Sequence, residues 1–255
     1  MNQTFNLNRF TNLFVKHTVD NYKTYLMSFF VLVGLMIISI GFLVFMNKQP
    51  LAVVKQGALF SFFLLVAGSI FTSIIFADLG DKKKAISILT LPASHFEKFL
   101  VGWTWSYIIF QLLYIPMFYL SVMVINQLFQ HEVSDKPELM SLFLADHYLV
   151  FFAVLHAIVL WASIYFETYH FIKVAFSFFI SYFLLIYLNF KFLMLLITQY
   201  IESAMPFTTV NIHENGKYFH LRMPGDEIKY TLMIFLVFAV ILWVGAFYRL
   251  KEKEV

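Results

Sequence analysis

The stretch Asp78–Gly102, DLGDKKKAISILTLPASHFEKFLVG, lies between two long apolar segments and combines a lysine cluster, an apolar strip, a proline and a helix-start signal. Pro92 restrains its own φ and disfavours helix at the residue before it, so a preceding helix ends there. Ser94 and Glu97 have the S-x-x-E spacing of a capping box, which predicts that a new helix begins at this point. A connection that only reverses the chain needs none of these features, so the stretch is a candidate functional element.

The helix predicted after Pro92 has one apolar face, formed by Phe96, Phe99 and Leu100 at the i, i+3 and i+4 positions. This face could pack in the groove of a partner protein, or it could lie on a membrane surface as a linker helix without a partner. The Lys82–Lys84 cluster suits attraction to anionic lipid headgroups. Both roles place the stretch beside a membrane.

The composition is that of an integral membrane protein. Of 255 residues, 61% are hydrophobic and only 13% are charged, whereas a soluble domain carries about 25% charged residues. The chain has no cysteine, which excludes disulfides, cysteine-ligated zinc and thiol catalysis. The net charge of +3 is too small and too dispersed to indicate a nucleic-acid partner.

Six segments are long and apolar enough to cross a bilayer, which takes about 20 residues. They are Tyr25–Met46, the segment between Lys55 and Asp78, Phe99–Leu128, Tyr148–Phe166, Ile172–Phe190 and the segment between Lys229 and Arg249. Backbone groups in lipid must be hydrogen-bonded within the segment, so we expect helices. The predicted fold is an all-α integral membrane protein with six transmembrane helices, in which residues 1–255 form a single transmembrane domain.

Residues 1–24, ahead of the first span, are predicted to form an interfacial helix. Arg9, Lys16 and Lys23 recur every seven residues and therefore share one face of a helix, with apolar residues such as Phe14 to one side. This pattern suits a helix lying in the headgroup layer. An ordinary solvated segment is the alternative.

Lysine and arginine predict the orientation. With the N-terminus inside, the inner side holds eleven of these 18 residues: Arg9, Lys16, Lys23, Lys82, Lys83, Lys84, Lys98, Lys173, Arg249, Lys251 and Lys253. The excess favours a multi-pass protein of the bacterial cytoplasmic membrane with both termini in the cytoplasm. All four tryptophans, at 103, 105, 161 and 243, fall near the inner ends of their spans, where amphipathic rings prefer to lie.

Residues 192–228 are predicted to form an external element between spans five and six. Lys191 can extend its amine to the outer interface, so the apolar run Phe192–Ile201 would lie on the outer leaflet or re-enter it. Two short alternating segments then flank Asn215 and Gly216. Asn-Gly is a strong hairpin signal, which predicts a small external β-hairpin.

The sequence offers no catalytic motif. It has no phosphate-binding P-loop, no H-E-x-x-H metalloprotease motif and no G-x-S-x-G nucleophile motif. Glu167 and His170 have the spacing of half a di-iron site, but the second half is missing, so a capped polar turn is the better interpretation. Another short helix is predicted from Ser134 to Pro137 on the outer side.

His156 is the one ionisable residue well inside a predicted span. Such residues are costly and often functional, but a neutral histidine hydrogen-bonded to a neighbouring helix is the simpler interpretation. Gln111 is the second candidate for an intramembrane polar site. Like Asn126 and Asn189, it is predicted to hydrogen-bond between helices rather than to bind a substrate.

The stretch Asp81–Gly102 resembles the cytoplasmic loop of type-2 ABC exporter permeases, the membrane-spanning subunits of ABC transporters. Leu89, Leu91, Pro92 and Ser94 match the family's LL-x-x-P-x-S/T strip, and Glu97 and Gly102 match in character. At its start the loop departs from the family, because Gly80-Asp81 precedes a lysine triplet here. The layout also matches, with an N-terminal interfacial helix, six spans and an element between spans five and six.

The resemblance implies that the loop between spans two and three docks on a separate ABC-type ATPase subunit, and that two permease copies form the working unit. The residues expected to make this coupling are Asp81, Leu89, Leu91, Pro92, Ser94, Phe96, Glu97 and Phe99. The chain itself is expected to bind no cofactor or metal and to have no enzymatic activity, since ATP would be hydrolysed on the partner. The alternatives are a non-transporting structural or assembly membrane protein, and a stand-alone channel or secondary carrier.

Overall fold

The computed structural model describes residues 5–80, 92–129, 138–141, 146–165, 170–197, 200–205, 209–214, 217–222 and 225–252. Three sets of predictions fall outside these residues: the contacts of Asp81, Leu89 and Leu91, the short helix from Ser134 to Pro137, and the polar turn at Glu167.

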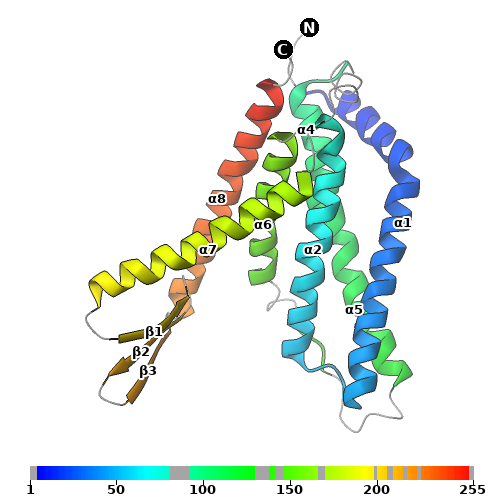
Figure 1. The fold of residues 1–255 in the computed structure, drawn as a ribbon. Coiled ribbons are helices and arrows are strands. Elements are labelled where there is room, and N and C mark those ends of the chain that lie inside the picture. The colour runs from blue at the N-terminus through cyan, green and yellow to red at the C-terminus, as the bar shows by residue number, and fades with distance from the viewer. Residues whose placement is uncertain are drawn as a thin grey trace.

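Helices dominate the described chain. They are α1 (Leu7–Asn47), α2 (Val53–Gly80), α4 (His95–Trp103), the π-helix η1 (Thr104–Ile109), α5 (Phe110–Leu128), α6 (Asp146–Tyr165), α7 (His170–Leu196) and α8 (Gly225–Glu252). In Figure 1, α1, α2, α5 and α6 run roughly side by side, α8 packs along α6, and α7 leaves the bundle at an angle. The start of α1 and the end of α8 both lie at the end of the bundle that carries α4 (Figure 1).

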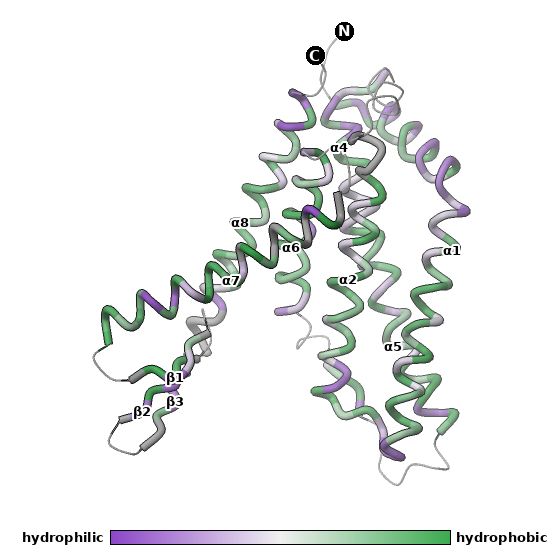
Figure 2. The backbone as a smooth tube through the Cα atoms, viewed as in Figure 1, coloured by the Kyte–Doolittle hydropathy of each residue, from purple (hydrophilic) through white to green (hydrophobic). Residues whose placement is uncertain are grey.

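Among the described residues, five helical segments are long and apolar enough to cross a membrane: Leu7–Asn47, Val53–Ile75, His95–Leu128, His147–Tyr165 and Lys229–Glu252. Figure 2 shows hydrophobic residues along the middle of these helices and hydrophilic residues toward their ends. The predicted fifth span corresponds to α7, whose described residues give only a shorter apolar stretch, Tyr182–Leu196. The multi-pass membrane class is therefore supported, whereas the number of six spans stays a prediction.

The N-terminal segment continues into the first span as one helix. Asn6 caps α1 with its side chain, and α1 then runs for 41 residues to Asn47, where Lys48 takes a left-handed conformation with φ of 50°. At 1.5 Å per residue this helix is about 60 Å long, twice the thickness of a bilayer core. Its first half therefore extends past the apolar layer, and residue 24 is not a helix boundary.

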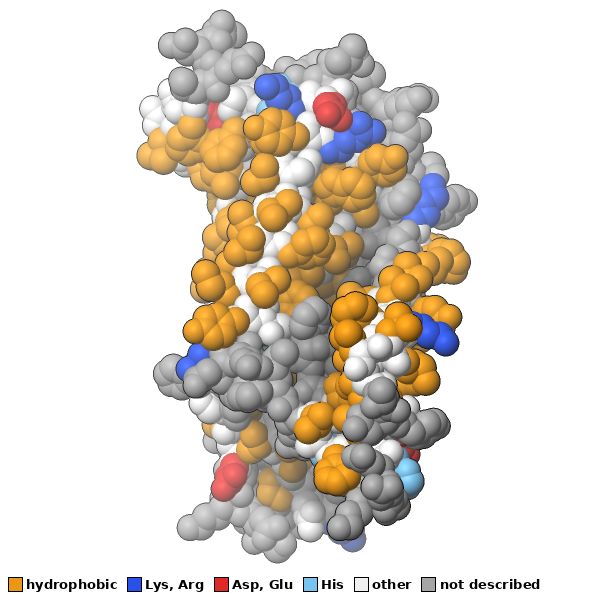
Figure 3. Space-filling view, turned by 90° about the vertical axis from the view of Figure 1, so that its left-hand side faces the viewer, with side chains coloured by type: hydrophobic (Ala, Val, Ile, Leu, Met, Phe, Trp, Pro, Cys, Tyr) orange, Lys and Arg blue, Asp and Glu red, His pale blue; other side chains and the backbone are white. Residues whose placement is uncertain are grey.

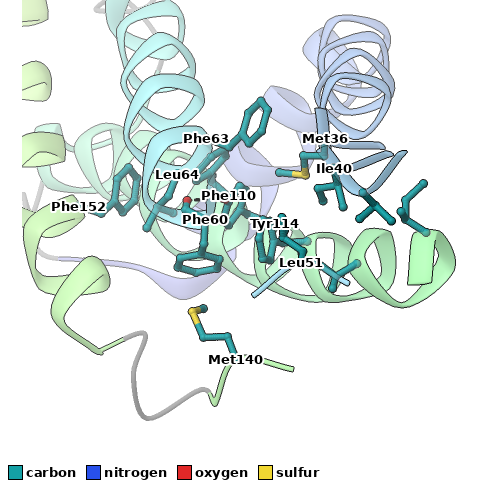
Figure 4. Close-up of a cluster of buried hydrophobic side chains, with 14 residues drawn as sticks. Met36, Ile40, Leu51, Phe60, Phe63, Leu64, Phe110, Tyr114, Met140 and Phe152 are labelled. Atoms are coloured by element: carbon teal, nitrogen blue, oxygen red, sulfur yellow. Dashed lines mark hydrogen bonds between the residues drawn. The ribbon is translucent and has the colours of Figure 1, made fainter. Parts of the chain in front are cut away.

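The main core joins α1, α2, α5 and α6 (Figure 4). Phe60 of α2 and Phe118 of α5 have ring centroids 5.2 Å apart, and Tyr114 lies equally close to Phe60. The Tyr114 hydroxyl donates a 2.6 Å hydrogen bond to the Phe60 carbonyl, so this buried phenol is satisfied. Pro116 lies inside α5 without ending it.

Replacing Gly68 by alanine is expected to destabilise the packing of α2 on α6. A Cβ atom at Gly68 would lie within 2.7 Å of the Phe152 ring and 3.0 Å from Phe110, both in the core. Overpacking of this kind costs about 1–3 kcal/mol. The matched control is Gly34→Ala in α1, where a Cβ atom meets nothing within 4 Å. We expect a lower unfolding temperature for Gly68→Ala and an equal or higher one for Gly34→Ala; equal values for the two variants would contradict the packing.

A three-stranded antiparallel sheet follows α7. Its strands are β1 (Tyr200–Met205), β2 (Thr209–Glu214) and β3 (Lys217–Arg222), in the order β1-β2-β3. The β2–β3 pair has the antiparallel strand pairing predicted for a hairpin, with Glu214 opposite Lys217 at its closed end. Its position outside the membrane, between spans five and six, stays a prediction. The first strand was not predicted, because Phe192–Ile201 has the composition of a membrane-embedded run. The structure instead extends α7 to Leu196 and pairs Ile201 with Ile212 of β2.

Candidate functional site

The predicted capping box at the start of α4 is confirmed. The Ser94 hydroxyl accepts a hydrogen bond from the backbone N–H of Glu97 at 3.2 Å, and Glu97 Oε2 accepts one from the backbone N–H of Ser94 at 2.8 Å. This reciprocal pair defines the first residue of α4 as His95. The capping box therefore fixes the start of α4 three residues after Pro92.

The Glu97 carboxylate also binds the start of α1. Its Oε1 accepts a 2.7 Å hydrogen bond from the backbone N–H of Asn6 and forms a 3.1 Å ion pair with Arg9 Nη2. The Glu97 side chain is fully buried, while that of Arg9 is 29% exposed. One carboxylate thus ties the first turns of α1 and α4 together, and it compensates its own burial with three hydrogen bonds, one of them from a cation.

Aromatic contacts join α4 to α8 beside this ion pair. The Phe99 ring lies 5.8 Å from that of Phe247, and Phe96 lies 5.9 Å from the same ring. Phe96 also meets Phe5, at 6.1 Å. We call the group formed by Asn6, Arg9, Ser94, Glu97, Phe99 and Phe247 the α1–α4–α8 joint.

The structure separates the predicted coupling residues into two groups. Glu97 and Phe99 are buried within the chain, against α1 and α8. Pro92 and Phe96 are exposed, Phe96 at 45%. The apolar face predicted from Phe96, Phe99 and Leu100 is thus partly covered by the chain's own helices, because α1 begins and α8 ends beside α4.

A second contact between α1 and the third apolar segment surrounds Trp105. Its indole ring stacks on Phe14 at 5.6 Å and lies 4.8 Å from the ring of Tyr25. The Tyr25 hydroxyl is hydrogen-bonded to His17 Nε2 at 2.7 Å. Apart from the interfacial position of Trp105, no feature of the sequence indicates this cluster. It extends the α1–α4–α8 joint along the first half of α1.

His156 is fully buried and hydrogen-bonded through both ring nitrogens. Trp243 Nε1–H donates to Nδ1 at 3.0 Å, and Ser106 Oγ lies 2.8 Å from Nε2. Because an indole nitrogen only donates, Nδ1 carries no proton, and a neutral ring must donate from Nε2 to Ser106. The Ser106 hydroxyl in turn donates to the Gly102 carbonyl at 2.8 Å. This confirms the interpretation of His156 as a histidine bonded to neighbouring helices, here η1 and α8.

Gln111 belongs to α5 and follows Tyr107 by one helical turn, at the edge of the same region. The Tyr107 ring in turn lies 5.1 Å from the His156 ring and 5.0 Å from Trp243. Ser106 and Tyr107 both belong to η1, a π-helix that the sequence did not predict. Short π-helical segments often lie at functional sites, and this one holds the polar contact to His156.

Within the described ranges, no group of three or more histidine, cysteine, aspartate or glutamate side chains is placed to hold a metal ion. The α1–α4–α8 joint links α1, α8 and the helical segment His95–Leu128 that begins with α4, and it includes the last part of the Asp78–Gly102 stretch.

Comparison with protein-family models, with curated proteins and with solved structures gives no match to this chain. Its function is therefore inferred from the contacts within the chain.

Proposed function

We propose that this chain is the membrane-spanning permease subunit of an ATP-driven ABC-type exporter. A separate ATPase subunit would dock on residues 78–102 and supply the energy, and the chain would work as one of two permease copies in a bacterial cytoplasmic membrane. The observation that carries this proposal is the α1–α4–α8 joint. It begins directly after residues 89–92, the apolar strip that is predicted to dock and is called the docking strip below.

A docking loop can drive transport only if its movement reaches the helices that line the path. Here the chain leaves the strip at Pro92 and enters α4 within three residues. The capping box aligns α4, the ion pair of Glu97 with Arg9 attaches it to α1, and Phe99 attaches it to α8. A force on the strip would therefore move three helices together rather than bend a free linker.

The surface fits the same proposal. Figure 3 shows hydrophobic side chains over the middle of this face, with several lysine and arginine side chains at the end that carries α4 and others beside and below the hydrophobic band. Because the start of α1 and the end of α8 lie at the same end, the proposal needs an even number of crossings, and we propose six. By the positive-inside rule this would be the cytoplasmic end, where an ATPase has access.

The proposal is tested by co-purification of the tagged full-length chain with the ABC-type ATPase encoded beside its gene. We expect the ATPase to bind the wild-type chain, and we expect the Leu89→Asp/Leu91→Asp variant to lose most of this binding, because a charge disrupts an apolar docking strip. The control is Val54→Asp, which introduces one carboxylate at a residue that is 84% exposed, at the end of α2 away from the docking strip. Equal ATPase recovery with all three chains, or none with the wild type, would overturn the proposal.

A further inference from the structure

The sheet after α7 has two chemically different faces. The strand register places Ile201, Ile212 and Phe219 in one row and Ala204, Val210 and Leu221 in the next, so these six residues share a face. Asn211 and His220 are paired on the opposite face, which is polar. A hydrogen bond from Asn211 Nδ2 to Ser203 Oγ, 2.8 Å long, extends across that polar face.

The apolar face is only half covered within the chain. Ile201, Ala204 and Ile212 are buried, at 1%, 6% and 9% exposure, where β1 packs against α7. On β3, Phe219 and Leu221 are 46% and 53% exposed. The uncovered part thus lies at the edge of the sheet farthest from β1.

The helix α7 shows what covers this surface. Tyr182, Phe183, Leu184 and Leu185 follow one another along the chain and point in four directions around the helix, and each is at least 44% exposed. A helix that is apolar on all sides and not enclosed by protein requires lipid around it. The exposed Leu195 and Leu196 carry this surface to the last turn before the sheet.

Because the helix that leads into the sheet is surrounded by lipid, and because Phe219 and Leu221 remain exposed on β3, we infer that the three-stranded sheet is a membrane-surface element. Its apolar face lies on the lipid, with Phe219 and Leu221 inserted among the acyl chains near the headgroups, and its polar face is turned toward water. Each strand alternates between the two environments, as an amphipathic helix does at an interface. The sheet would hold the far end of α7 at a fixed depth, independently of any ATPase.

The absence of native cysteine makes this orientation directly measurable. Single cysteines replace Phe219 and Leu221 on one face and Asn211 and His220 on the other, in the full-length chain labelled with an environment-sensitive nitrobenzoxadiazole dye. In vesicles of phosphatidylethanolamine and phosphatidylglycerol, we expect spin-labelled lipid to quench the dye at Phe219 and Leu221 severalfold more than the dye at Asn211 and His220. Aqueous iodide should quench the dye at Asn211 and His220 severalfold more than at Phe219.

Two further measurements test whether the sheet is present in the vesicles and whether lipid covers its apolar face. The double variant Asn211→Cys/His220→Cys should form an intramolecular disulfide in the same vesicles, because these residues are direct cross-strand partners. Failure to form it would mean that the sheet is not present. Equal iodide quenching on both faces, or efficient cross-linking between two copies through Phe219→Cys, would overturn the lipid assignment; the latter result would show that a second chain covers the face.

Discussion

Replacing Glu97 by alanine is expected to lower the free energy of unfolding by about 2–4 kcal/mol. The carboxylate is fully buried and binds the backbone N–H groups of Asn6 and Ser94 and the guanidinium of Arg9. Its removal leaves three donors without their acceptor at the junction of α1 and α4. Breaking a buried pair costs about 3–5 kcal/mol, and because Arg9 is 29% exposed, water recovers part of that cost.

The matched control is Glu252→Ala in α8. Glu252 forms a 2.8 Å ion pair with Arg249, but its side chain is 65% exposed. Exposed pairs contribute about 0–1 kcal/mol, so this variant should unfold almost as the wild type does. Unfolding of the purified chain by dodecyl sulfate in mixed micelles gives both values. Equal losses for the two variants would contradict the burial of the Glu97 pair.

A double-mutant cycle separates the ion pair from the backbone contacts of Glu97. If Arg9 stabilises the chain mainly through Glu97, the double variant will lose less unfolding free energy than the sum of the losses measured for Arg9→Ala and Glu97→Ala. Under the proposed function, both single variants should also weaken ATP-dependent transport while the ATPase remains bound, because docking is kept and the transmission to α1 is lost.

The parts of this structure that the sequence predicted are those set by neighbouring residues. The capping box spans four residues, from Ser94 to Glu97, and the spacing alone identifies it. The β2–β3 hairpin is marked by the Asn215-Gly216 dipeptide between alternating segments. Long apolar runs identify membrane helices because a backbone in lipid has few alternatives.

The parts that it could not predict depend on residues far apart in the chain. Arg9 and Glu97 are separated by 88 positions, and nothing local to either indicates that α1 turns back to meet α4. The strand β1 forms because β2 is placed to pair with it. Taken alone, the apolar run that ends at Ile201 fits a membrane-embedded segment equally well. The π-helix η1 likewise contains a long-range contact, between Ser106 and His156, 50 residues away.

His156 offers the second large effect. We expect His156→Ala to cost about 3–5 kcal/mol, because it leaves a cavity among Tyr107, Phe152 and Trp243 and also removes two hydrogen bonds. His156→Phe fills the space but makes neither hydrogen bond. Hydrogen bonds between membrane helices contribute about 0.6 kcal/mol on average and at most about 1.7 kcal/mol. We therefore expect His156→Phe to lower the free energy of unfolding by about 1–2 kcal/mol.

The difference between these two variants separates packing from polarity. His220→Ala is the matched control, since His220 is exposed on the sheet and its replacement should leave the unfolding free energy within about 0.5 kcal/mol of the wild type. If His156→Phe is as stable as the wild type, the contacts to Ser106 and Trp243 contribute nothing, and η1 must be held by other interactions. If it unfolds more easily by the expected amount, His156 links η1, α6 and α8. A movement that begins at α4 would then reach the middle of the bundle through Ser106.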